Sequence, residues 1–203
     1  MTPVRVAVLA SGGGTNLQAL LDALHDSPLA RVVRVLSTQP HAGALERARR
    51  AGVPAAVLRD PGDAAELLTA LDQGGAHGGG GADLVVLAGY LKLVPAEVVA
   101  RYRWRMINIH PALLPACGGP GMYGRRVHAA VLASGAAESG ATVHYVDEQY
   151  DRGPIIAQAR VPVRPGDTPD TLAARVLAVE HELLPRVVLE LARRGLPDQP
   201  VRI

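Results

Sequence analysis

The sequence predicts an α/β protein with a Rossmann-like, mainly parallel sheet, helices on both faces of that sheet and an antiparallel C-terminal part. Three observations support this fold. Short β-branched runs alternate with longer amphipathic runs through the first half of the chain. The run 84–88 is entirely apolar, as expected of a strand covered on both faces. Two extended runs near residues 140–163 follow each other without a helical pattern between them, which indicates antiparallel strands.

The elements follow in order from this pattern. Strands are expected at residues 4–10, 31–37, 55–58, 84–88 and 106–110. Helices are expected between them, at residues 16–25, 44–51, 64–71 and 95–102, the first from its leucine spacing and the last from a proline at its first turn. Ligands bind beyond the carboxyl ends of parallel strands. This rule points to residues 11–16 and 108–115.

The last third of the chain is different. Residues 140–147 and 154–163 are the two extended runs, and a long helix is expected from about residue 168 to Arg194. Thr168 or Asp167 would be its N-cap, and Gly195 would end it. We interpret the glycine-rich stretch 74–81 as a flexible surface loop. A hinge between two domains is the alternative, and it would place strands 55–58 and 84–88 in different sheets.

Composition excludes several classes of protein. The chain has 203 residues, 48% of them hydrophobic and 20% charged, which predicts one globular domain over residues 1–203. A formal charge of +2 and 3% aromatic residues argue against a nucleic-acid partner. The single cysteine, Cys117, excludes an intramolecular disulfide and a cysteine-rich metal site. We expect a cytoplasmic protein, because no apolar run suits a signal peptide or a membrane span.

The segment Ser11-Gly12-Gly13-Gly14-Thr15-Asn16 is the first candidate site. A strand that ends in glycines and opens a helix leaves N–H groups free to bind an anion. The P-loop pattern fails because no Gly-Lys-Ser/Thr follows, and the dinucleotide pattern fails because Leu17 replaces its third glycine. A single phosphate, as on a sugar monophosphate, fits better. A tight turn without a ligand is the alternative.

The segment Asn108-Ile109-His110-Pro111 is the second candidate. Asn108 and His110 point to the same face of a strand, where an imidazole can move a proton and an amide can donate to an oxyanion. A buried structural histidine is the alternative. No metal-ligand spacing links the histidines, so we predict no metal. No Gly-x-Ser-x-Gly elbow indicates a serine hydrolase.

The acidic turn 147–154 is the third candidate. On spacing alone a solvated turn is the simpler interpretation, although a carboxylate on a rigid turn could orient and charge-stabilise an imidazole. His144 lies on the preceding extended run with Thr142 on the same face. It could support the site or be a hydrogen-bonded sheet residue, and the second interpretation is favoured.

Four pieces of the sequence, taken together, resemble the glycinamide ribonucleotide formyltransferases, folate-dependent enzymes of purine synthesis. The resemblance runs from about Val4 to Gly195. The pieces are Val8 to Ala19 with Ser-Gly-Gly-Gly-Thr-Asn-Leu-Gln, Leu87 to Leu93, Ile107 to Pro115 with Asn-x-His-Pro, and Gly140 to Ile156 with Asp-x-Gly-Pro. The last two motifs are shared by all folate formyl-transfer domains, and the glycine-rich piece is specific to this member.

The resemblance implies roles for matching residues. Asn108, His110 and Asp151 match the catalytic trio. The residues that match binding segments are Gly14, Thr15 and Asn16 for the ribonucleotide phosphate, Glu180 for the ribose hydroxyls, and Leu91, Lys92, Leu93, Val94, Asn108 and Tyr150 for the folate. Two departures stand out. Lys92 replaces a common arginine, which keeps the charge and loses the planar fork. Residues 62–64 replace a segment that often carries an arginine for the folate tail.

The implied reaction is attack by the amine of glycinamide ribonucleotide on the formyl carbon of 10-formyltetrahydrofolate. Asn108 and a protonated His110 would stabilise the oxyanion, and Asp151 would raise the pKa of the imidazole. No metal or covalent enzyme intermediate is expected, and the enzyme would be a monomer or homodimer. Formyltetrahydrofolate deformylase and methionyl-tRNA formyltransferase carry additional domains for which residues 4–203 leave no room. A non-catalytic phosphosugar-binding domain is the remaining alternative, and the intact trio argues against it.

Overall fold

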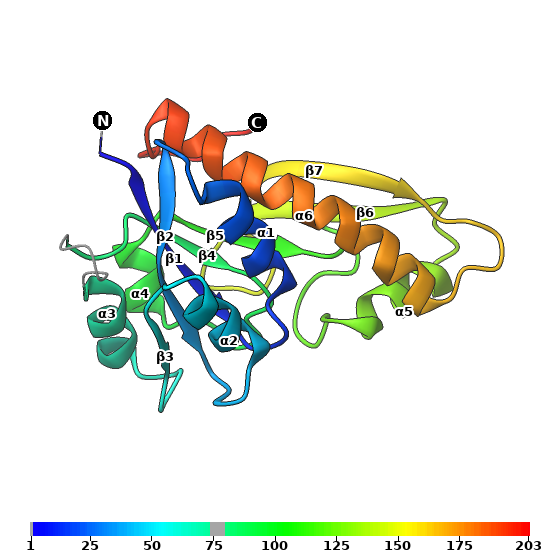
Figure 1. Ribbon diagram of the computed structural model, residues 1–203. Helices are drawn as coiled ribbons and strands as arrows, with labels where there is room; N and C mark the ends of the chain where they lie inside the picture. The colour runs from blue at the N-terminus through cyan, green and yellow to red at the C-terminus, as the bar shows by residue number, and fades with distance from the viewer. Residues whose placement is uncertain (1, 74–79) are drawn as a thin grey trace.

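The computed structural model describes residues 2–73 and 80–203 and is built around a seven-stranded sheet (Figure 1). The strands are β1 (Val4–Ala10), β2 (Ala30–Ser37), β3 (Ala55–Val57), β4 (Leu84–Leu87), β5 (Met106–His110), β6 (Glu138–Tyr145) and β7 (Ile155–Pro162). Their order is β3-β2-β1-β4-β5-β6-β7. Strands β1 to β5 pair in parallel, whereas β6 pairs antiparallel with both β5 and β7, so the predicted mixed sheet is confirmed.

Helices cover both faces of the sheet. They are α1 (Thr15–Leu24), α2 (Gly43–Arg50), α3 (Ala64–Asp72), α4 (Ala96–Arg101), α5 (Arg125–Ala133) and α6 (Pro169–Arg194). Buried side chains of α1, α2, α5 and α6 form one apolar cluster with the sheet, and those of α3 and α4 form a second cluster on the opposite face. Figure 1 shows α6 running along its face of the sheet beside α1.

The burial of β1 explains why the parallel strands are continuously apolar. Val6, Val8 and Ala10 belong to the first cluster, and Ala7 and Leu9 belong to the second. Because side chains alternate between the two faces and helices cover both, each residue from Val6 to Ala10 must be apolar.

The predicted elements agree with the structure to within two residues at each end. Thr168, one of the two residues predicted as the N-cap, caps α6 through a capping box with Thr171. Helix α5 is an element that the sequence analysis did not predict. Strands β3 and β4 lie in the same sheet, which argues against a domain hinge between them. Most of the glycine-rich stretch 74–81, interpreted as a flexible loop, lies outside the described residues.

The strand order sets the place of a ligand site. The chain moves outward from β1 through β2 to β3, and then returns to the other side of β1 to form β4 and β5. The loops after β1 and β4 therefore diverge and leave a crevice at the carboxyl ends of the strands. No helix in the described part of the chain is long and apolar enough to cross a membrane.

Candidate active site

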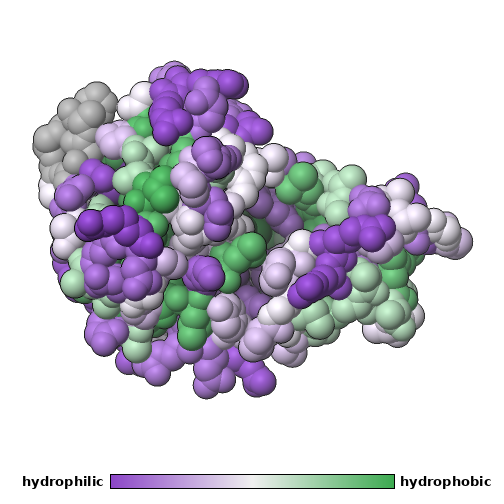
Figure 2. All heavy atoms as spheres, turned by 90° about the horizontal axis from the view of Figure 1, so that it is seen from below, coloured by the Kyte–Doolittle hydropathy of each residue, from purple (hydrophilic) through white to green (hydrophobic). Residues whose placement is uncertain are grey.

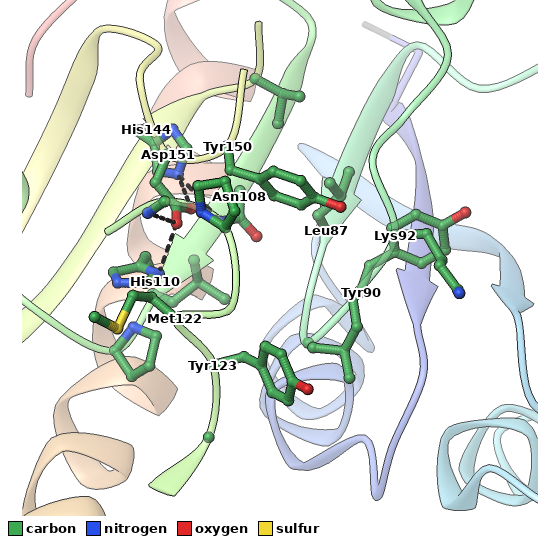
Figure 3. Close-up of a pocket in the computed structure, with 18 of the residues that line it drawn as sticks. Leu87, Tyr90, Lys92, Asn108, His110, Met122, Tyr123, His144, Tyr150 and Asp151 are labelled. Atoms are coloured by element: carbon green, nitrogen blue, oxygen red, sulfur yellow. Dashed lines mark hydrogen bonds and ion pairs between the residues drawn. The ribbon is translucent and has the colours of Figure 1, made fainter. Parts of the chain in front are cut away.

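A cavity of about 580 Å³ opens at the carboxyl ends of the parallel strands. Figure 2 shows a hollow on this side of the molecule with apolar side chains beside it, and Figure 3 shows the residues that line the cavity. The predicted site residues that line it are Asn16, Leu91, Lys92, Leu93, Val94, Asn108, His110, Tyr150, Asp151 and Glu180. Gly14 and Thr15 are not among the lining residues, and they precede Asn16 at the start of α1.

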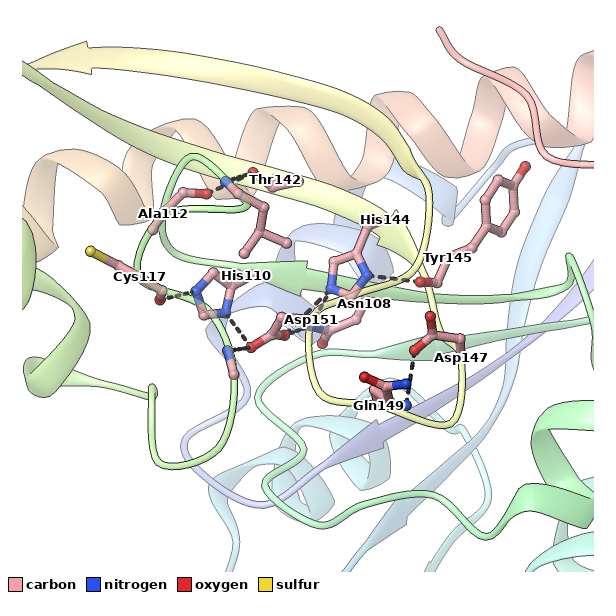
Figure 4. Close-up of polar contacts among 12 residues, drawn as sticks. Asn108, His110, Ala112, Cys117, Thr142, His144, Tyr145, Asp147, Gln149 and Asp151 are labelled. Atoms are coloured by element: carbon pink, nitrogen blue, oxygen red, sulfur yellow. Dashed lines mark hydrogen bonds and ion pairs between the residues drawn. The ribbon is translucent and has the colours of Figure 1, made fainter.

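Asp151 is the centre of the polar cluster at one end of this cavity (Figure 4). Its Oδ2 accepts a hydrogen bond from the Gly119 N–H at 2.9 Å and lies 3.5 Å from His110 Nδ1. Its Oδ1 accepts a long hydrogen bond from Asn108 Nδ2 at 3.4 Å and lies 3.5 Å from His144 Nε2. The backbone of Asp151 has φ 58°, a strained conformation for a non-glycine residue and one found often at functional sites.

The carboxyl group of Asp151 is held in its charged form. Burial raises its pKa, but the nearby imidazoles of His144 and His110 and the hydrogen bond from the Gly119 N–H together bring the pKa below its ordinary value. The acidic turn is therefore not a solvated turn at this position. It presents a buried carboxylate to two imidazoles.

His110 is almost fully buried, with both ring nitrogens facing acceptors. Nε2 donates to the carbonyl oxygen of Cys117 at 2.8 Å, and Nδ1 faces Asp151. Burial lowers the His110 pKa below its usual value, even though Asp151 and the Cys117 carbonyl pull it upward. The expectation that Asp151 keeps His110 protonated toward neutral pH is therefore wrong in its net direction. Burial outweighs the carboxylate, and the resting imidazole is neutral at pH 7.

His144 belongs to the site, contrary to the favoured interpretation of a simple sheet residue. Its Nδ1 donates to the carbonyl oxygen of Tyr145 at 2.8 Å, which leaves Nε2 of the neutral ring as an acceptor. Asn108 Nδ2 donates to this Nε2 at 3.1 Å. His144 thereby orients the Asn108 amide. Strands β5 and β6 place Asn108 directly opposite His144, a pairing that could have been anticipated only with the strand register in hand.

The chain that leaves β5 is fixed by Thr142 (Figure 4). The Thr142 hydroxyl donates to the Ala112 carbonyl at 2.6 Å and accepts from the Leu114 N–H at 3.0 Å. This pair of bonds sets the path of the loop toward Cys117, whose carbonyl holds His110. Residues 119–124 of the same loop line the cavity.

The other end of the cavity is formed by α1 and α6. Asn16 Nδ2 donates to Glu180 Oε2 at 2.6 Å, and Asn16 Oδ1 is buried without a hydrogen-bond partner among the described residues. Glu180 is 7% exposed, and burial raises its pKa to about 7 despite the bond from Asn16. Gly14, with φ 74°, precedes α1, and a Cβ there would lie 2.6 Å from Ala44 Cα. Glycine is therefore required at this position by α2 as well as by its backbone conformation.

The segment after β4, residues 91–94, forms a further wall of the cavity. Val94 is buried, whereas Leu91 and Leu93 are about half exposed at the mouth of the cavity, as expected of residues that an apolar ligand would cover. At the position where an arginine was considered, Asp63 caps α3 by accepting from the N–H groups of Ala65 and Glu66. Within residues 2–73 and 80–203, no group of three or more His, Cys, Asp or Glu side chains could hold a metal ion.

Comparisons with known proteins agree on one family. Residues 4–188 match the model of the formyl transferase family. Phosphoribosylglycinamide formyltransferase of Escherichia coli is 38% identical over 91% of this chain and 85% of its own length. The chloroplastic phosphoribosylglycinamide formyltransferase of Arabidopsis thaliana is 45% identical over 91% of this chain, which spans 64% of the length of that relative. The solved glycinamide ribonucleotide transformylase 1 of Symbiobacterium toebii superposes with a TM-score of 0.84 at 40% identity, covering 100% of this chain and 94% of the other.

Proposed function

The chain belongs to the formyl transferase family, and on that premise we propose that it transfers a formyl group from 10-formyltetrahydrofolate to the amine of glycinamide ribonucleotide. The products would be formylglycinamide ribonucleotide and tetrahydrofolate, in de novo purine biosynthesis. The observation that carries the proposal is one cavity lined by Asn108, His110 and Asp151 at one end and by Asn16 and Glu180 at the other. Relatives that carry the name of this enzyme support it.

Two different parts of the cavity suit the two substrates. The first turn of α1, with Gly14, Thr15 and Asn16, offers free N–H groups to a phosphate, and Glu180 offers a carboxyl group to ribose hydroxyls. The segment Leu91 to Val94 with Tyr150 and Asn108 offers an apolar wall and a polar edge to the folate. A volume of about 580 Å³ is within the ordinary range for small-molecule sites.

The polar cluster can move the proton that the reaction requires. A bond forms between the substrate amine nitrogen and the formyl carbon, the bond from that carbon to N10 of the folate breaks, and a proton passes from the amine to N10. The carbonyl oxygen of Cys117 accepts the Nε2–H of His110. Nδ1 of the neutral ring is therefore the proton acceptor. The Asp151 carboxylate then stabilises the imidazolium while it carries the proton.

Asn108 is placed to serve the developing oxyanion. One amide hydrogen is committed to His144 at 3.1 Å, whereas the second makes only the 3.4 Å contact with Asp151. That second hydrogen can be redirected to an oxygen in the cavity at little cost, because its present bond is long. His144 would keep the amide oriented during this change.

The proposal is tested by turnover of the purified protein with both substrates, followed by the absorbance change on folate deformylation. Formation of formylglycinamide ribonucleotide, confirmed by mass spectrometry, is expected only when both substrates are present. Deformylation without the ribonucleotide would instead indicate a hydrolase, and binding of the ribonucleotide without turnover would indicate a phosphosugar-binding protein. Either result would overturn the proposal.

The remaining expectations belong with this function. Small-molecule substrates as the partners of the chain, a monomeric or homodimeric state and a single domain over residues 1–203 stay predictions. A cytoplasmic location also stays a prediction, and the Arabidopsis thaliana relative is described as chloroplastic.

A further inference from the structure

Helix α2 contacts the glycine loop, residues 12–14, through two hydrogen bonds. The Ala44 N–H donates to the Gly12 carbonyl at 3.2 Å, and Arg47 Nε donates to the Gly13 carbonyl at 2.8 Å. The two segments also touch closely, because a Cβ on Gly43 would lie 2.9 Å from the Gly13 oxygen. Two consecutive carbonyls of the loop are therefore turned toward α2.

The orientation of these carbonyls fixes the N–H groups of the loop. In a trans peptide the C=O and the following N–H point in opposite directions. The N–H groups of Gly13 and Gly14 must therefore point away from α2. With φ 74° at Gly14 and the helix beginning at Thr15, consecutive N–H groups can converge in the concave arrangement that binds anions.

Arg47 makes the stronger of the two contacts, because its donor is charged. Its Nη1 also donates to Gln18 Oε1 at 3.1 Å, so the guanidinium bridges the loop and α1. Arg47 also influences α6. Burial lowers the pKa of His181, and the positive charge of Arg47 lowers it further. The other two arginines of α2 form ion pairs with Glu46. Arg49 Nη1 lies 3.7 Å from Glu46 Oε2, and Arg50 Nε lies 3.0 Å from Glu46 Oε1.

We propose that Arg47 is a positioning residue for the phosphate of the ribonucleotide: by holding the Gly13 carbonyl, it keeps the Gly14 N–H turned toward the phosphate. This inference rests on the proposed function. Without the guanidinium, the Gly13–Gly14 peptide can rotate, and its carbonyl oxygen would then repel the phosphate that its N–H should bind. Arg47 acts through the loop and is not itself a lining residue of the cavity.

The proposal is tested by comparing two substrates in Arg47→Ala. One is glycinamide ribonucleotide and the other is glycinamide riboside, which is the same molecule without the phosphate. For Arg47→Ala we expect KM for the ribonucleotide to rise about tenfold, the loss typical of one hydrogen bond to a charged group, with kcat at saturation nearly unchanged. The kcat/KM for the riboside should not change. Arg50→Ala is the matched control on the same helix, and it should behave as wild type.

The outcomes separate the inference from its premise. A wild-type protein that does not formylate the ribonucleotide would overturn the proposed function. An equal loss on both substrates in Arg47→Ala would show that Arg47 supports only the fold, and would overturn the inference alone.

Discussion

The two ends of the cavity each contain a buried carboxyl group, and the pKa values of the two groups are shifted in opposite directions. Asp151 is contacted by the Gly119 N–H, Asn108, His110 and His144, and its pKa lies below the ordinary value. Glu180 accepts one bond, from Asn16, and burial raises its pKa to about 7. Burial raises the pKa in both cases. The number of hydrogen-bond donors and imidazole neighbours decides which carboxyl group stays charged.

This difference suits the two tasks. A carboxylate that must stabilise a transient imidazolium should be charged before the substrates arrive, because reorganisation during the reaction is costly. A carboxyl group that meets ribose hydroxyls can donate or accept a hydrogen bond, and a pKa near 7 allows it to do either. The donors that Glu180 lacks in the free protein are the ones that a ribose would supply.

Substitution of Asp151 tests this comparison and should have the largest effect on activity. Asp151→Asn keeps the shape and removes the charge, so kcat should fall by about 10²–10⁴-fold, the range typical of lost acid–base and electrostatic assistance. Binding of the ribonucleotide, measured by calorimetry, should change little, because the proposed phosphate site lies at the other end of the cavity. His110→Ala should show the same pattern. Near-normal turnover in either variant would remove these residues from the proton path.

Sequence alone predicted the sheet and most of the named residues that line the candidate site, because both depend largely on local patterns. The apolar run of β4 indicated a buried parallel strand, and the alternation in Asn108-Ile109-His110 placed both polar side chains on one face. The motif around Asp151 was found from its resemblance to a family. Thr168 was one of two predicted caps, because capping is decided within four residues.

Other features depend on distances that no local pattern contains. His144 was underestimated because its role follows from the register between β5 and β6, which places it opposite Asn108. The net pKa shift of His110 was predicted in the wrong direction, since a neighbouring carboxylate is visible in the motif and the degree of burial is not. The contact between Arg47 and Gly13 joins residues 34 positions apart.

Glu180→Gln tests the other carboxyl group through stability. Because the folded pKa is raised from 4.5 to about 7, the unfolded state loses this proton first as the pH rises. Wild-type stability should therefore fall between about pH 4.5 and pH 7 relative to the variant. Above pH 8 the variant should be more stable by at most about 3 kcal/mol, from 1.4 kcal/mol per pKa unit. Urea unfolding at pH 5 and pH 9 measures this difference.

The exposed Glu182, on the same helix, provides the control. Glu182→Gln should leave the difference between pH 5 and pH 9 as in wild type. If Glu180→Gln were no more stable than wild type at pH 9, folding would not raise the pKa of Glu180. The contrast with Asp151 would then be lost.

His144→Phe tests whether the orientation of Asn108 matters. Phenylalanine fills a similar volume but cannot accept from Asn108 Nδ2 or donate to the Tyr145 carbonyl. We expect kcat to fall about tenfold, less than for a group that takes part in proton transfer, because a positioning role is lost and the amide can still reach the oxyanion. Stopped-flow turnover at saturating substrates measures the effect. A change confined to KM for the ribonucleotide would place His144 outside the reacting centre.

The smallest expected effect is on the titration of His110, and it isolates what Asp151 contributes. Burial has already lowered the His110 pKa, and Asp151 is the largest influence that opposes burial. Removing the carboxylate in Asp151→Asn should therefore lower the pKa further, so that the imidazole stays neutral to more acidic pH.

The acid limb of kcat/KM, where protonation disables the neutral base, should move to lower pH in the same variant, even though its rate is reduced. Nuclear magnetic resonance titration of the ring protons in both proteins measures the shift. An unchanged His110 curve would show that the carboxylate does not stabilise the imidazolium. Asp151 would then act by orienting the loop through its bond to Gly119, and the charge contrast with Glu180 would have no part in catalysis.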